Sequence, residues 1–381
     1  MDWLYGVPLH WTWLVLYVFC LVGLVQLFYY WVWFSRIAFY KDRPPADFDF
    51  PPVSVVICAR NEYRNLEKNL PLILEQNYEN FEVVVVDDFS EDDSEILLQQ
   101  LQGKYKYLKV IKLRENVNFF KGKKLALSVG IKSAKNEVLL LTDADCRPAG
   151  PKWIEAMVRN YQGNTRIVLG YGAYASRPGF LNKLIRFDTL FIAIQYFGFA
   201  LAGKPYMGVG RNLSYHRSLF FKAKGFTSHY KVTSGDDDLF INQVATKNNT
   251  AIEISPESHT ISIPKKTIEE WFRQKRRHLT TGRHYKKRHR FMLGFFHFSQ
   301  VLFYGLFVFL LVCCASSLIG LIAAGMFLLR VIVMQIVLYY ACKRFNERKL
   351  FLYSLLADIV LTFFNILFAI PSRSHKKNKW K

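Results

Sequence analysis

The stretch FEVVVVDDFS, residues 81–90, decides the fold of this chain. Four consecutive valines suit a strand that is buried on both faces of a sheet, and two aspartates follow where that strand would end. Similar runs occur as VSVVIC at 53–58, LKVIKL at 108–113 and EVLLLT at 137–142, with helix-like stretches between them. This alternation predicts repeated βαβ units and therefore an α/β domain with a mostly parallel sheet.

Three clusters of carboxylates stand out because each follows an apolar or strand-like run. They are Asp87-Asp88, Asp143-Ala144-Asp145 and Asp236-Asp237-Asp238. The first two come where parallel strands would end, and open α/β sheets bind their ligands at that edge. In a chain whose formal net charge is +21, this gathering of acidic residues predicts a metal and acid/base site.

Four long apolar segments lie outside the α/β pattern. Residues 11–34 are apolar apart from Thr12 and Gln26, which is long enough to cross a hydrocarbon core of about 30 Å. The other segments lie at 295–314, 318–340 and 350–370. No Lys or Arg precedes the first segment and no small-residue cleavage site follows it, so we predict a membrane anchor rather than a cleaved signal peptide.

The basic residues predict how the chain is oriented in the membrane. Arg36, Lys41 and Arg43 follow the first segment, which places the residues after it on the cytoplasmic side of an inner or plasma membrane. The last segment carries Asp358 and Asn365, which are costly in hydrocarbon, and a fourth crossing would put the basic tail SRSHKKNKWK outside. Whether this segment crosses is left open, with a re-entrant or interfacial position as the alternative.

These patterns divide the chain into four parts. We predict a transmembrane anchor at 1–40, a cytoplasmic α/β domain at 41–264, a basic amphipathic interfacial segment at 265–292, and a C-terminal membrane domain with a basic tail at 293–381. Positive charge gathers beside the apolar segments without a nucleic-acid-binding motif, so we expect membrane lipids and no nucleic acid as partners. A non-enzymatic transport or export component is the alternative, but it leaves the carboxylate clusters unexplained.

Seven pieces of the sequence, taken in order, resemble the membrane-bound glycosyltransferases of family 2 and their polysaccharide-synthase branch. They are VSVVICARNE, VVVVDDFS, GKKLALSVG, LLLTDAD, GVGRNLSYHRSLF, SGDDDLF and QKRRH, between about residues 53 and 278. The resemblance implies a GT-A fold that binds a nucleotide-diphosphate sugar, expected to be a UDP-sugar. It also implies inverting transfer of that sugar to a membrane-associated glycan or a lipid-linked acceptor.

The first four pieces supply the predicted donor and metal residues. Asp143 and Asp145 can offer oxygen ligands to Mg²⁺ or Mn²⁺ beside the donor diphosphate, and an Asx-turn after the strand is the alternative. The resemblance assigns the uracil and ribose to Asp87 and Asp88, which could instead cap the next helix. The other predicted donor residues are Ala59, Arg60, Glu62 and Lys123, the last of which could also be an ordinary surface lysine.

The fifth and sixth pieces supply the predicted acceptor and base residues. Inverting transfer requires a base for the acceptor hydroxyl, and the resemblance makes Asp237 that base and Asp236 its neighbour. Capping of the following helix is the alternative for this acidic run. Gly210 and Asn212 resemble the acceptor side of the family site, with a tight turn as the alternative.

The last piece, Gln274 to His278, resembles the QxxRW motif of polysaccharide synthases. Gln274 and Arg277 are the predicted contacts to the donor diphosphate, for which a forked guanidinium is suited. His278 stands where those synthases have tryptophan, so we predict an acceptor contact there and a non-processive enzyme. A processive polysaccharide synthase is the alternative function.

Overall fold

The computed structural model describes residues 3–4, 7–41, 50–113 and 123–369. Pro44 and Pro45 of the predicted linker and the basic tail at 372–381 lie outside this part of the chain. The chain forms a helical unit, drawn from residues 1–40 and 286–371, and an α/β unit within residues 41–285.

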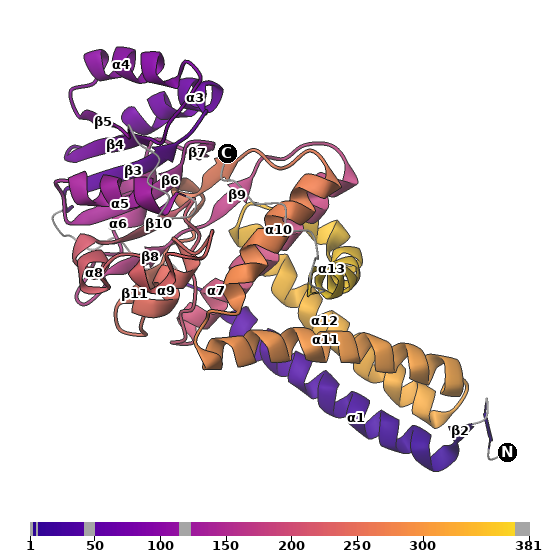
Figure 1. The fold of residues 1–381 in the computed structure, drawn as a ribbon. Helices are drawn as coiled ribbons and strands as arrows, with labels where there is room; N and C mark the ends of the chain where they lie inside the picture. The colour runs from indigo at the N-terminus through magenta and orange to yellow at the C-terminus, as the bar shows by residue number, and fades with distance from the viewer. Residues whose placement is uncertain (1–2, 5–6, 42–49, 114–122, 370–381) are drawn as a thin grey trace. The chain divides into compact units, whose positions relative to one another are not determined.

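The α/β unit is built on a seven-stranded sheet of order β11-β8-β10-β6-β3-β4-β5 (Figure 1). Its strands β3 to β6 are parallel neighbours, β10 runs antiparallel between β6 and β8, and β11 is parallel to β8. The bounds are β3 Val53–Ala59, β4 Phe81–Asp87, β5 Leu108–Lys112, β6 Val138–Asp143, β8 Ile167–Leu169, β10 Leu213–His216 and β11 Thr250–Ile252. The predicted α/β class with a mostly parallel sheet is therefore confirmed.

The apolar runs of the sequence become the centre of this sheet because helices cover it. Every residue of β3 is buried, as is every residue of β4 after Phe81. The connecting helices are α3 Tyr63–Leu74, α4 Ser94–Lys104 and α5 Lys124–Ser133. On α5, a Cβ at Gly130 would lie 2.6 Å from Cγ1 of Val56, so glycine lets this helix approach the sheet closely.

A second, three-stranded sheet extends the carboxyl edge of the first. Its order is β7-β12-β9, with β12 antiparallel to β7 and parallel to β9. The bounds are β7 Cys146–Pro148, β9 Gly172–Tyr174 and β12 Thr260–Ser262. Because β7 begins directly after Asp145, this sheet ties the second acidic cluster to the segment that leads into α10 Ile268–Gly282.

The remaining helices of the α/β unit include one that the sequence analysis missed. Helix α7 Phe180–Leu201 is long and apolar enough to cross a membrane by length and composition, yet 78% of its most apolar window is buried inside the structure. Its Asp188 pairs with Lys275 of α10 at 2.7 Å. The other elements are α6 Trp153–Val158, α8 Arg217–Lys222, η2 Thr227–His229, α9 Asp238–Val244 and η3 Pro256–Ser258.

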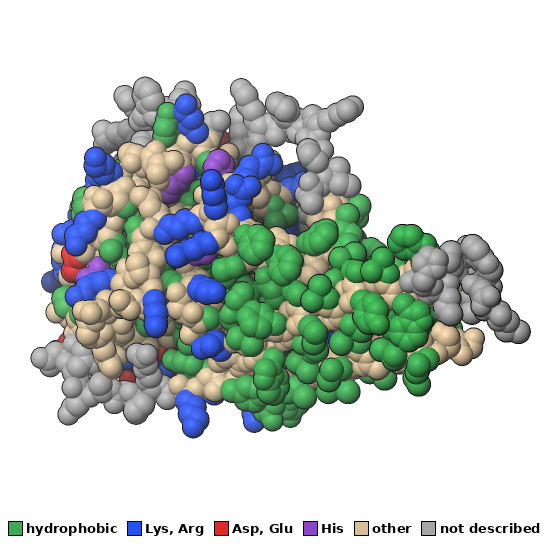
Figure 2. Space-filling view, turned by 90° about the horizontal axis from the view of Figure 1, so that it is seen from below, with side chains coloured by type: hydrophobic (Ala, Val, Ile, Leu, Met, Phe, Trp, Pro, Cys, Tyr) green, Lys and Arg blue, Asp and Glu red, His purple; other side chains and the backbone are tan. Residues whose placement is uncertain are grey.

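The helical unit contains the four predicted apolar segments. Helix α1 Leu9–Phe28 continues through a π-helical stretch, η1 Tyr29–Phe34, into α2 Ser35–Ala38, and it packs against α11 Lys287–Cys314 and α12 Leu318–Arg344. The short strands β1 Trp3–Leu4 and β2 Val7–Pro8 precede α1, whereas η4 Arg348–Tyr353 and α13 Ser354–Ala369 follow α12. Large apolar side chains are exposed along these helices, and Figure 2 shows a broad apolar surface of this kind.

Among the described residues, five helical stretches are long and apolar enough to span a membrane, namely α7 and the four stretches of the helical unit. In the helical unit, large side chains face outward with no protein to cover them, as with Leu21 and Leu321 at 64% and 69% exposure. Hydrocarbon is the environment that suits such a surface.

Candidate active site

The sheet register brings the first two acidic clusters to one edge. Ala59 at the end of β3 is paired with Asp87 of β4, and the preceding Cys58 is paired with Asp143 of β6. The strand ends thus deliver both carboxylates to the same place, as parallel strands do at the ligand-binding edge of an open sheet.

The predicted metal ligands lie at the end of β6. Ligand atoms of Asp143, Asp145 and Cys146 all lie within 4.8 Å of one another. Burial raises the pKa of Asp145, and the adjacent Asp143 carboxylate adds to the effect, so a bound cation would relieve an unfavourable charge. Burial also raises the pKa of the Cys146 thiol, whose Sγ lies 3.0 Å from Oγ of Ser262. The two carboxylates therefore fit a hard divalent cation, and the thiol does not.

Lys123, immediately before α5, connects the second acidic cluster with the third. Its Nζ donates to Oδ1 of Asp143 at 2.8 Å and lies 3.1 Å from Oδ2 of Asp236. Burial alone would lower the pKa of Lys123, but the two carboxylates raise it well above its ordinary value. An ammonium group thus already lies between the predicted metal ligand and the predicted base cluster.

Asp237 is held with its carboxylate fixed by backbone groups. Oδ2 accepts from the Gly210 amide at 2.7 Å, and Oδ1 accepts from the Asp238 amide at 2.7 Å at the start of α9. Burial raises the pKa of Asp237 to about 7, and the flanking charges of Asp236 and Asp238 contribute. Burial alone would also raise the pKa of Asp236, but the neighbouring Lys123 ammonium lowers it. The cluster therefore contains one carboxylate suited to proton transfer near neutral pH.

The third carboxylate of this cluster has a different environment. Oδ2 of Asp238 accepts from the hydroxyl of Thr281 on α10 and from that of Tyr285 at 2.7 Å. Asp238 therefore joins the start of α9 to the end of α10. Asp237 caps α9 through the Asp238 amide, and helix packing accounts for Asp238, but neither explains why Asp236 is buried beside them.

Gly210 and Asn212 differ in what they offer an acceptor. Gly210 lies against the predicted base, because a Cβ there would be 3.2 Å from Oδ2 of Asp237. Asn212 is fully buried, accepts from Nε1 of Trp153 at 3.0 Å and donates to the carbonyls of Tyr171 and Ser258 at 2.9 and 2.7 Å. We therefore assign Asn212 to holding the segment in place rather than to acceptor contact.

The predicted nucleotide pocket is shaped by the loops after β3 and β4. The carbonyl of Ala59 accepts from the Asp88 amide at 2.8 Å, which joins the two loops. Asp87 accepts from the Ser90 amide through Oδ1 at 3.1 Å, while its buried Oδ2 has no hydrogen-bond partner among the described residues. That oxygen is free to accept from a ligand N–H or O–H group.

Two further predicted donor residues flank this pocket. Burial raises the pKa of Asp88, and the charge of Arg60 opposes the shift. Burial likewise raises the pKa of Glu62. A hydrogen bond from Asn65 opposes this shift, whereas the charges of Asp145 and Asp143 add to it. Glu62 is therefore close enough to the predicted metal ligands for their charges to affect its ionisation.

Helix α10 carries the QKRRH motif. Gln274 donates through Nε2 to the Tyr174 hydroxyl at 3.0 Å, and the guanidinium of Arg211 lies 4.2 Å from the centre of the Tyr174 ring. In the described part of the chain, the buried Nε of Arg277 has no hydrogen-bond partner, as expected of a group that binds an anionic ligand. His278 is exposed.

Sequence reasoning assigned no separate site role to two cations of this region. Arg211 lies within the quoted GVGRN piece and donates to Oγ of Ser262 at 3.0 Å, so its position in that motif was the available signal. Lys124 is fully buried and donates to the carbonyls of His229 and Ser234 at 3.1 and 2.7 Å, which fixes the loop before Asp236. No feature of the sequence distinguishes it from Lys123.

Comparison with known proteins identifies the domain. Residues 54–223 match the family model described as glycosyl transferase family 2. An uncharacterized glycosyltransferase of Haemophilus influenzae is 31% identical over 124 residues, which cover 32% of this chain and 36% of that protein. The glycosyltransferase AglE of Haloferax volcanii is 28% identical over 141 residues, covering 36% and 45% respectively.

Two more relatives extend the comparison. Poly-beta-1,6-N-acetyl-D-glucosamine synthase of Staphylococcus aureus is 26% identical over 133 residues, covering 34% of this chain and 29% of that protein. The structure of the mannosyltransferase PcManGT from Pyrobaculum calidifontis, in complex with GDP-Man and Mn²⁺, aligns with a TM-score of 0.58 at 17% identity and covers 93% of this chain and 99% of that one. The chain spans less than half the length of the three curated relatives named here.

The fold and the match together define the class. Residues 54–223 are a glycosyl transferase family 2 domain, carried on the GT-A type of α/β fold. The predicted family, fold class and enzyme class are confirmed for this domain.

Proposed function

We propose that this chain is an inverting glycosyltransferase that moves a sugar from a nucleotide-diphosphate sugar to a membrane-associated acceptor. The observation that supports the proposal is the contact of Lys123 with both Asp143, the proposed metal ligand, and Asp236 of the proposed base cluster. A donor diphosphate and an acceptor hydroxyl require these two kinds of group side by side.

The donor is expected at the carboxyl edge of the sheet. Asp87, with its unpartnered oxygen, and Asp88 would take the base and ribose, for which we propose a uridine nucleotide. Asp143 and Asp145 would hold Mg²⁺ or Mn²⁺, which when bound would neutralise the charge that develops on the leaving diphosphate. Arg277 would contact the same diphosphate through its guanidinium, whose buried Nε has no partner among the described residues.

The acceptor hydroxyl is expected beside Asp237. A base with a pKa of about 7 is mostly ionised just above neutral pH and still accepts a proton readily. Asp237 would take the hydroxyl proton as that oxygen forms its bond to the anomeric carbon and the bond to the diphosphate breaks. Gly210 and Asp238 amides hold the carboxylate in place for this step.

The setting of the domain supports a membrane-associated acceptor. The same chain carries a unit whose helices expose large apolar side chains, which we propose to be embedded in an inner or plasma membrane with the α/β domain in the cytoplasm. The bound GDP-Man of PcManGT and the polymer made by the Staphylococcus aureus synthase illustrate donors and products of similar proteins. A lipid-linked intermediate or a glycan fits this setting.

Processive synthesis is the alternative, and the Staphylococcus aureus relative is the reason to keep it. The exposed His278 argues against it, because an imidazole is a smaller platform for a growing chain than an indole. We therefore propose that the enzyme adds one or a few sugars for each acceptor encounter.

A panel of nucleotide sugars offered to the detergent-solubilised protein tests the proposal. With Mn²⁺ present, we expect slow release of nucleoside diphosphate from at least one sugar, and loss of that release in Asp237→Asn. A transport or export component would release none from any member of the panel, which would refute the proposed activity.

A further inference from the structure

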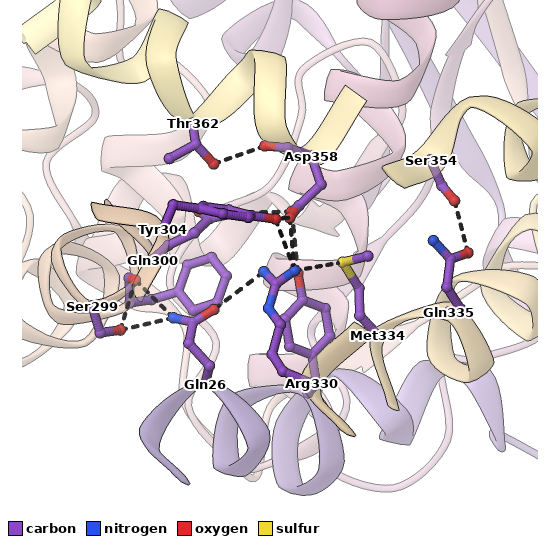
Figure 3. A network of polar contacts seen from close by, with 12 residues as sticks. Gln26, Ser299, Gln300, Tyr304, Arg330, Met334, Gln335, Ser354, Asp358 and Thr362 are labelled. Atoms are coloured by element: carbon purple, nitrogen blue, oxygen red, sulfur yellow. Dashed lines mark hydrogen bonds and ion pairs between the residues drawn. The ribbon is translucent and has the colours of Figure 1, made fainter. Parts of the chain in front are cut away.

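The helical unit contains a buried ion pair that no step of sugar transfer requires. Nη1 of Arg330, in the middle of α12, lies 2.9 Å from Oδ2 of Asp358 on α13, and the two residues are 0% and 3% exposed (Figure 3). Charged residues inside an apolar helix bundle are costly unless they are paired, so their presence points to a specific task.

Side chains from every long helix of the unit complete this pair. Asp358 also accepts from Gln300 at 2.8 Å and Tyr304 at 2.5 Å, both on α11, and from Tyr30 of η1 at 3.4 Å. Arg330 in turn donates to Oε1 of Gln26 on α1 at 3.4 Å. The Asp358 carboxylate is therefore the group through which the other helices hold α13.

The surface of α13 is apolar outside and polar inside. Its buried residues recur at helical spacing and include the ion-pair carboxylate: Ser354, Ala357, Asp358, Leu361 and Thr362. The exposed ones are large and apolar, with Leu356 at 52% and Phe363 at 59%. A helix with this distribution suits lipid on one side and a polar contact with protein on the other.

The orientation of α13 differs from that of a crossing helix. Figure 1 shows α13, in yellow, viewed nearly along its axis, whereas α1 and α11 run across the picture. With the preceding η4, α13 forms an apolar helical stretch of 20 residues, Arg348–Leu367, so its orientation rather than its length distinguishes it from α11 and α12.

The depth of the ion pair follows from the ends of α11 and α12. Their connecting turn at 315–317 has no charged residue, while Lys287, Arg288, Lys343 and Arg344 mark the opposite ends. A helix needs roughly 20 residues to cross the hydrocarbon. Counted from the uncharged turn, this length ends at about residue 295 of α11 and about residue 337 of α12. Gln300 and Arg330 then lie about 8–10 Å inside the boundary at the basic ends.

We propose that α13 does not cross the membrane: it is a lipid-facing helix that lies across the bundle near the boundary at the basic ends of α11 and α12, held there by the Arg330–Asp358 pair. Among the described helices, α1, α11 and α12 then make the crossings. Residues 372–381, which are strongly basic, return to the side of Arg36, as the positive-inside tendency favours. The inference does not depend on the proposed transfer reaction.

Reporter fusions to the full chain test the topology. Alkaline phosphatase, active only when exported, and green fluorescent protein, fluorescent only when retained inside, are placed after Ser316, Asn346 or Lys381. We expect phosphatase activity only at Ser316 and fluorescence at the other two. Phosphatase activity after Lys381 would show that α13 crosses, and fluorescence after Ser316 would overturn the membrane location itself.

A double-mutant cycle tests the ion pair. Arg330→Met and Asp358→Leu should each lower the melting temperature in detergent by several degrees, because each leaves an unpaired buried charge. The combined variant should melt close to the wild-type protein, because no buried charge remains. Additive losses in the combined variant, or single variants that melt as the wild type does, would contradict a holding role for the pair.

Discussion

The pH dependence of transfer should report the ionisation of Asp237. Burial and the charges of Asp236 and Asp238 raise its pKa to about 7, and the ionised form is the one that can take a proton. About a tenth of the protein would carry that form at pH 6 and about nine-tenths at pH 8. We therefore expect kcat/KM to rise roughly tenfold between these pH values and then level off.

Variants of the same cluster separate this explanation from others. Asp237→Asn should lower kcat by at least about a hundredfold with donor affinity nearly intact, because the base acts on the acceptor hydroxyl. Asp238→Asn removes a negative neighbour, so it should be milder and should move the rise to lower pH. A flat profile from pH 5 to 8 would refute the reasoning. An inactive Asp236→Asn beside an active Asp237→Asn would shift the base assignment by one residue.

Three further predictions concern the residues around this base. Lys123→Met should weaken donor binding and move the rise in kcat/KM to higher pH, because it removes a cation that lowers the Asp237 pKa. Lys132→Met, at an exposed position of the helix that follows Lys123, is the control, and a rise that moves to lower pH in Lys123→Met would contradict the assignment. Gly210→Ala should lower turnover roughly tenfold, because the added methyl lies 3.2 Å from the Asp237 carboxylate. Gly103→Ala, where an added methyl has nothing within 4 Å, should not lower turnover, and equal activity of the two variants would count against this prediction. With excess acceptor the products should be short and evenly distributed, and His278→Trp should lengthen them; long polymer made while most acceptor is unused would show processive synthesis.

The sequence predicts the parallel half of the sheet well because local composition determines it. The runs at 53–58, 81–86, 108–113 and 137–142 became β3 to β6 with ends shifted by two residues or fewer. Each is short and apolar with branched side chains, so burial on both faces is its natural state. The two acidic clusters at the ends of β4 and β6 were placed at one edge for the same reason.

The features that the sequence did not predict depend on distant partners. Strand β10, with the residues LSYH, is too short for its alternation to stand out in the sequence, and it is a strand because β6 and β8 flank it. Helix α7 was missed because Arg186 and Asp188 interrupt its apolar run, although both are buried in the fold. Arg330 and Asp358 are 28 residues apart, so the sequence showed Asp358 only as an unpaired charge that is costly in hydrocarbon.

The contacts of Lys123 could not be foreseen either, because they join β6 to a loop about ninety residues later in the chain. Spacing identified the three acidic clusters but gave no distance between them. The structure supplies the distances, and it separates Asp237, held by backbone amides, from Asp238, held by Thr281 and Tyr285.

The binding of UDP with and without Mn²⁺ tests the central claim most directly. Calorimetry on the solubilised full chain should show that Mn²⁺ strengthens UDP binding in the wild-type protein, because Asp143 and Asp145 join the cation to the diphosphate. Asp143→Asn and Asp145→Asn should each abolish that strengthening while the protein keeps its melting behaviour. Unchanged metal-dependent affinity in both variants would contradict the assignment of these carboxylates and, with it, the proposed donor site.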